Sequence, residues 1–153
     1  MNAESPSNPY LGKLRGSFQG LLQWSDFDGF WDQLRAEAGQ QPSMDSGWYV
    51  YAIGETPPNV HADVETLLRF LDESQTLLHK EHEEPYCGIV YVDRRDAPEM
   101  IKVYDPSNLG VSCGSSDNPP LPGWILSKLA PIDLPNALQP PRNRQRWWQR
   151  VLG

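Results

Sequence analysis

The sequence predicts an α+β protein in which a small, mainly antiparallel sheet of three to four strands packs against about three helices. Apolar residues recur at spacings of three and four in three segments, which indicates helices with one buried face. Short runs of aromatic and β-branched residues, bounded by glycine or proline, are typical of strands. The polar connection from Asp93 to Pro98 is only six residues long, which is too short for a crossover helix and predicts an antiparallel hairpin.

The first expected helix begins at Pro9, with Asn8 as its capping residue. Its apolar face would consist of Leu11, Leu14, Phe18 and Leu21 or Leu22. Glycine occurs at every fourth position of the same segment and disfavours a helix interior. A frayed or partly irregular helix is therefore the alternative.

The second expected helix begins at Ser25, where Asp28 completes a variant capping box, and ends at Gly39. The third and longest runs from about His61 to Glu83 and carries a regular series of leucines. Acidic residues near its N-terminus complement the helix dipole there.

Three strands are expected, at Trp48 to Ile53, Tyr86 to Val92 and Met100 to Tyr104. The short apolar segment Trp124 to Leu126 is either a fourth strand or the anchor of a loop.

Length and composition predict a single α+β domain over residues 1–130, since domains of about 100–150 residues are the commonest. This domain includes a long, ordered loop rich in Gly, Ser and Pro. Residues 131–153 are expected to form a Pro-rich linker and a C-terminal segment rich in Arg and Trp. We expect this segment to dock on protein; a disordered tail, weak contact with an anionic membrane surface and contact with nucleic acid are the alternatives.

The formal net charge of −7 argues against a protein that coats nucleic acid, because phosphate binding requires clustered Lys and Arg. An acidic chain fits a basic protein partner better. No stretch approaches the roughly 20 apolar residues of a membrane-spanning helix, and the N-terminus lacks the pattern of a signal peptide. We therefore expect a cytoplasmic protein whose two cysteines are free thiols.

The stretch Gly110 to Gly114 matches the G-x-S-x-G pattern of a hydrolase, with Ser112 as nucleophile, but no histidine follows it and its C-terminal flank does not favour a helix. A reactive thiol at Cys113 is a better candidate for catalysis, with a histidine of the long helix as its base. The loop from Ser112 to Ser116 is also a candidate anion-binding nest. A structural role for this loop is the simplest interpretation of its composition.

Two histidines and a cysteine form a weak candidate metal site at the end of the long helix. His79 and His82 would share one helical face, and Cys87 follows at the start of a strand. Histidines in the last turn of a helix also complement its dipole, which is the ordinary alternative. No cofactor is expected.

Two further features could contact a partner. The hairpin tip carries Arg94 and Arg95, and a proline-rich loop leads to Trp124. We favour packing of that loop on the protein itself, with Trp124 as the anchor, over its presentation to a partner. The full set of residues expected to bind a partner or ligand is Asn108, Ser112, Cys113, Ser115, Ser116, Trp124, Arg94, Arg95, Trp147 and Trp148.

The sequence lacks a complete catalytic constellation. We therefore expect a protein that acts by binding another protein, as an adaptor, an accessory factor or an inhibitor of a basic partner. One alternative is a small thiol-dependent enzyme or an anion-binding module centred on Cys113 and residues 110–116. The other is a metal-binding protein that uses His79, His82 and Cys87.

Overall fold

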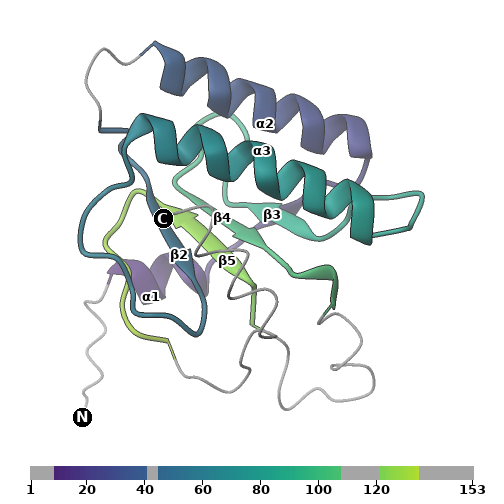
Figure 1. The fold of residues 1–153 in the computed structure, drawn as a ribbon. Coiled ribbons are helices and arrows are strands. Elements are labelled where there is room, and N and C mark those ends of the chain that lie inside the picture. Colours follow the sequence, from purple (N-terminus) through teal and green to yellow (C-terminus); the bar gives the residue numbers. More distant parts are fainter. Residues whose placement is uncertain (1–8, 41–44, 108–120, 135–153) are drawn as a thin grey trace.

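The computed structural model describes residues 9–40, 45–107 and 121–134. It contains three helices, α1 (Pro9–Leu14), α2 (Trp24–Gly39) and α3 (Val64–Glu81). The strands are β1 (Gln19–Gly20), β2 (Tyr49–Ala52), β3 (Val90–Val92), β4 (Met100–Val103) and β5 (Trp124–Ser127). Helices α2 and α3 lie side by side across one face of the sheet, and α1 lies against the other (Figure 1).

The five strands form one antiparallel sheet in the order β1-β3-β4-β5-β2. β3 and β4 form the expected hairpin, with Tyr91 opposite Lys102. β5 lies between β4 and β2, so that Leu126 faces Ile101 on one side and Val50 on the other. The last part of the described chain therefore completes the centre of the sheet, while β1 and β2 form its edges.

The main core lies between the sheet and the two long helices. Helix α2 contributes Phe27, Phe30, Trp31 and Leu34, all at most 5% exposed. The apolar residues of α3 pack beside them over the inward-facing side chains of β3, β4 and β5. Asp63 caps α3 by accepting a bond from the Thr66 amide at 2.8 Å.

A smaller core covers part of the opposite face of the sheet. Tyr10 of α1 packs there with Tyr51, Met100 and Ile125. The chain after β5 returns over this face as far as Leu134, which is buried and whose amide donates to the Tyr51 hydroxyl at 3.2 Å. Residues 131–134 thus pack on the sheet.

The structure confirms the α+β class and corrects the number of strands from three or four to five. Of the two interpretations of the segment after Pro9, the partly irregular helix is the one that the structure shows, because α1 ends at Leu14. Phe18 then packs against the smaller core, and the next two residues form β1. Trp124 to Leu126 belongs to a true strand, whereas the strand expected from Tyr86 begins only at Val90.

The β3–β4 hairpin is closed by Asp93, whose side chain is 5% exposed. Its Oδ1 accepts bonds from the amides of Glu99 (2.9 Å) and Met100 (3.2 Å), and its Oδ2 pairs with Lys13 Nζ at 3.2 Å. Burial alone raises the pKa of this carboxyl, but the amide bonds and the ammonium outweigh it and hold the pKa below the usual 3.8. The ionised form of Asp93 therefore stabilises the fold and ties α1 to the hairpin.

We expect Asp93→Asn to lower the free energy of unfolding at pH 7 by about 1–3 kcal/mol, because the amide group of the variant meets Lys13 in place of a carboxylate. The folded-state pKa is depressed, so the difference between wild type and variant is complete above pH 3.8 and is lost as the pH falls through the folded-state pKa. Urea titrations at pH 7, 5 and 3 measure this difference. An equal difference at pH 7 and pH 3 would contradict the assignment; Glu73→Gln on the exposed face of α3 is the control.

Candidate functional site

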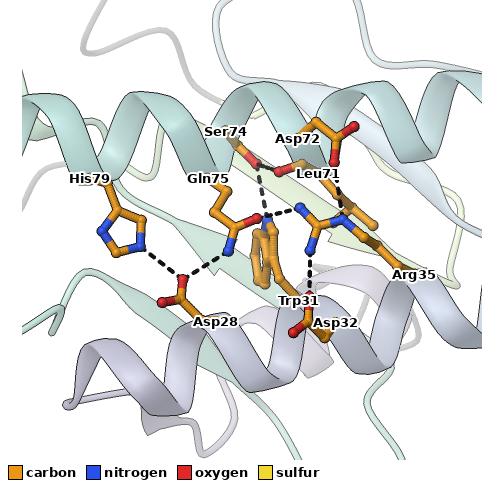
Figure 2. A network of polar contacts seen from close by, with 9 residues as sticks. All are labelled: Asp28, Trp31, Asp32, Arg35, Leu71, Asp72, Ser74, Gln75 and His79. Carbon is orange, nitrogen blue, oxygen red and sulfur yellow. Dashed lines mark hydrogen bonds and ion pairs between the residues drawn. The ribbon is translucent and has the colours of Figure 1, made fainter.

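A line of polar contacts joins α2 to α3 (Figure 2). At its buried centre the indole Nε1 of Trp31 donates to Ser74 Oγ at 3.1 Å, and the Ser74 hydroxyl donates to the Leu71 carbonyl at 3.2 Å. Trp31 and Ser74 are fully buried. A buried indole N–H requires an acceptor, so this bond sets the register of one helix against the other.

On the solvent side the same interface is held by Arg35 of α2. Its guanidinium donates to Asp32 at 2.8 Å, to Asp72 of α3 at 3.0 Å and to the side-chain carbonyl of Gln75. Gln75 in turn donates to Asp28 Oδ1 at 2.8 Å. The chain of contacts runs along the helix pair towards the end of α3, as Figure 2 shows.

The line ends at His79, whose Nε2 donates to Asp28 Oδ1 at 2.8 Å. The His79 ring stacks on the indole of Trp24, with centroids 4.3 Å apart and planes at 28°. The same indole makes a T-shaped contact with Phe27 of the core, with centroids 5.9 Å apart. Trp24, the first residue of α2, is therefore fixed between the last turn of α3 and the core.

Trp24 also holds the link between α3 and β3, which consists of residues 82–89. Its Nε1 donates to the carbonyl of Glu84 at 2.9 Å. Within the link, His82 Nε2 donates to the carbonyl of Cys87 at 2.9 Å, and the Cys87 amide donates to the carbonyl of Leu22 at 2.7 Å. The next residue, Gly88, has φ +66°, a conformation that side chains disfavour.

The link and the segment before α2 each present a large apolar side chain to solvent, Tyr86 and Leu22. Among the described residues three large hydrophobic side chains are exposed: Leu22 at 59%, Tyr86 at 60% and Val60. Leu22 and Tyr86 belong to neighbouring backbone segments, because the residue after Tyr86 bonds to the Leu22 carbonyl. We call the surface formed by Leu22, Trp24, Glu83, Glu84 and Tyr86 the corner surface.

The candidate metal ligands do not converge. His79 bonds to Asp28, His82 to a backbone carbonyl, and Cys87 is 1% exposed in the core. Within the three described ranges, no group of three or more His, Cys, Asp or Glu side chains is arranged to hold a metal ion. Cys87 is a free thiol, and burial raises its pKa, so it is protonated at neutral pH.

The two arginines of the hairpin tip are exposed and engaged in ion pairs. Arg94 bonds to Asp96 at 3.1 Å, and Arg95 lies 3.8 Å from Asp26 near the start of α2. The tip is thus on the same side of the molecule as the corner surface. Trp124, in contrast, is 2% exposed within β5 and packs in the main core, which fits the favoured interpretation of packing on the protein itself.

The remaining expected site residues lie outside the described residues. They are Asn108, Ser112, Cys113, Ser115, Ser116, Trp147 and Trp148. In the described part of the chain, no helix is long and apolar enough to cross a membrane.

Comparisons of the chain with models of known protein families, with curated proteins and with solved structures find no match in any of the three.

Sequence reasoning did not find the corner surface. The sequence pattern predicts Leu21 or Leu22 on a helical face and Tyr86 at the start of a strand, and it does not include Trp24. The one available signal was the run Glu83-Glu84-Pro85, which predicts the end of the long helix just before Tyr86.

We expect Ser74→Ala to lower the free energy of unfolding by about 1–3 kcal/mol, because it leaves the buried Nε1–H of Trp31 without its acceptor. Urea denaturation followed by tryptophan fluorescence measures the change. Thr76→Ala, at an exposed position of the same helix, is the control and should change stability by less than about 0.5 kcal/mol. Equal effects of the two substitutions would contradict the structural role of the Trp31–Ser74 bond.

Proposed function

We propose that the protein acts by binding another protein, and that the corner surface is the contact site. The observation that carries the proposal is the pair of exposed side chains, Leu22 and Tyr86, on two backbone segments held together by hydrogen bonds. Single exposed hydrophobic residues are common, whereas exposed apolar patches rimmed by polar residues mark interaction sites.

The fixed geometry supports this proposal. Trp24 and His82 each donate a side-chain hydrogen bond to a backbone carbonyl of the link between α3 and β3. Tyr86 lies between those two carbonyls in the sequence, so little backbone entropy would be lost when a partner covers it. Tyrosine and tryptophan are also the residues that most often carry binding energy at protein interfaces.

The proposal describes an adaptor, accessory factor or inhibitor without catalysis of its own, acting in the cytoplasm. Neither alternative gains support from the described residues. The thiol or anion site depends on Cys113 and residues 110–116, which lie outside them. The expected metal ligands do not belong to a group of three or more described side chains that could hold a metal ion.

Affinity capture with the immobilised full chain tests the proposal. Bound proteins from an extract of cells that express it are identified by mass spectrometry. We expect Tyr86→Ala to deplete a stoichiometric partner by more than about tenfold, the loss typical of a central aromatic contact. Val60→Ala is the matched control, because Val60 is 68% exposed but lies outside the corner surface.

Circular dichroism establishes that each variant remains folded. A partner that the wild type, Tyr86→Ala and Val60→Ala all retain equally would overturn the assignment of the contact to the corner surface. Failure of the wild type to retain any protein would contradict the binding function itself.

A further inference from the structure

The corner surface has a distinct charge. The two acidic residues next to its exposed tyrosine, Glu83 and Glu84, are themselves exposed. Neither forms an ion pair with any residue in the described ranges. Two solvated carboxylates therefore precede Tyr86 on the corner surface, separated from it by Pro85.

The surroundings add to this negative charge. Asp26 and Asp28 lie at the start of α2, and Glu81 lies at the end of α3. Among the described residues, Lys80 lies in the last turn of α3 and Arg95 at the hairpin tip, and Arg95 is already close to Asp26 at 3.8 Å. The described chain as a whole has nine Lys and Arg against 18 Asp and Glu, so its long-range field has the same sign as the corner surface.

The hairpin tip does not oppose this field. Arg94 makes two bonds to Asp96, at 3.1 and 3.3 Å, which hold its charge beside a carboxylate. An acidic partner segment would therefore meet like charges at Glu83 and Glu84 without a free guanidinium at the tip to offset them.

We propose that the segment bound at the corner surface is basic and amphipathic: its apolar side chains cover Leu22 and Tyr86, and its Arg or Lys side chains pair with Glu83 and Glu84. This inference rests on the proposed function and specifies the partner's chemistry. The exposed Tyr86 ring adds a second attraction for cations, since a guanidinium or ammonium over an aromatic face is stabilised by the ring quadrupole. Charge complementarity would increase the rate of association and discriminate against acidic segments.

Two synthetic 18-residue peptides test the charge preference directly. One is an amphipathic helix of leucine and lysine, and the other has glutamate in place of every lysine. Isothermal titration calorimetry gives the affinities, and amide chemical shifts of the full chain locate the contact. We expect the lysine peptide to bind, with shifts concentrated at residues 22–24 and 82–88, and the glutamate peptide to show no binding.

The double variant Glu83→Gln/Glu84→Gln keeps both side chains nearly isosteric and removes their charges. We expect it to weaken binding of the lysine peptide by about three- to tenfold, as the loss of two exposed ion pairs allows. The matched control is Glu37→Gln/Glu73→Gln, which removes two exposed carboxylates from the outer faces of α2 and α3 and should change the affinity by less than about twofold. If the two double variants weakened binding equally, the effect would come from net charge and not from the corner surface, and the inference would be overturned.

Capture from the cell extract distinguishes failure of this inference from failure of the proposed function. Suppose that a partner is lost on Tyr86→Ala but fully retained by Glu83→Gln/Glu84→Gln. This result would support the binding function and contradict the inference that the bound segment is basic. A partner whose capture falls with both variants, and which is released as the salt concentration rises from 50 to 300 mM, would support both the binding function and the basic segment.

Discussion

The candidate site depends on the contacts that the indole of Trp24 makes. The indole stacks on His79, makes a T-shaped contact with Phe27 and donates to the Glu84 carbonyl, and so joins the start of α2, the end of α3 and the link to β3. A side chain without either the ring area or the N–H group would leave at least one of the three segments unsupported.

The position of Trp24 in turn depends on the layer below it. The buried Trp31–Ser74 bond and the side-chain bonds of Arg35 fix α2 against α3. The two helices cover one face of an antiparallel sheet in which β5, the last strand of the described chain, lies between β4 and β2. On the other side of the sheet, Asp93 and Lys13 tie α1 to the β3–β4 hairpin. The corner surface is thus presented by a framework of long-range contacts, since Trp24 and Glu84 are 60 residues apart in sequence.

The fold was largely predictable from local patterns. Local sequence determines three of its elements, so local patterns predict them: the leucine series predicts α3, the aromatic stripe predicts α2, and the short polar turn predicts the β3–β4 hairpin. β1 was not predictable, because its two residues form a strand only by pairing with Val92 and Tyr91. The corner surface was not predictable for the same reason, because the segments of Leu22 and Tyr86 are joined only by tertiary hydrogen bonds. The loop sites expected from the sequence were predicted from composition alone.

The central claim is that a rigid link presents Tyr86, and amide hydrogen exchange of Cys87 and Gly88 tests it most directly. Both amides bond to backbone carbonyls, at 2.7 and 3.0 Å, in a link that the Trp24 indole holds in place. The account predicts slow exchange in the full chain and much faster exchange in Trp24→Phe, which keeps an aromatic ring but loses the donor to Glu84, while interior amides of α3 remain protected. Fast exchange of both amides in the wild-type chain would show a mobile link and contradict the account.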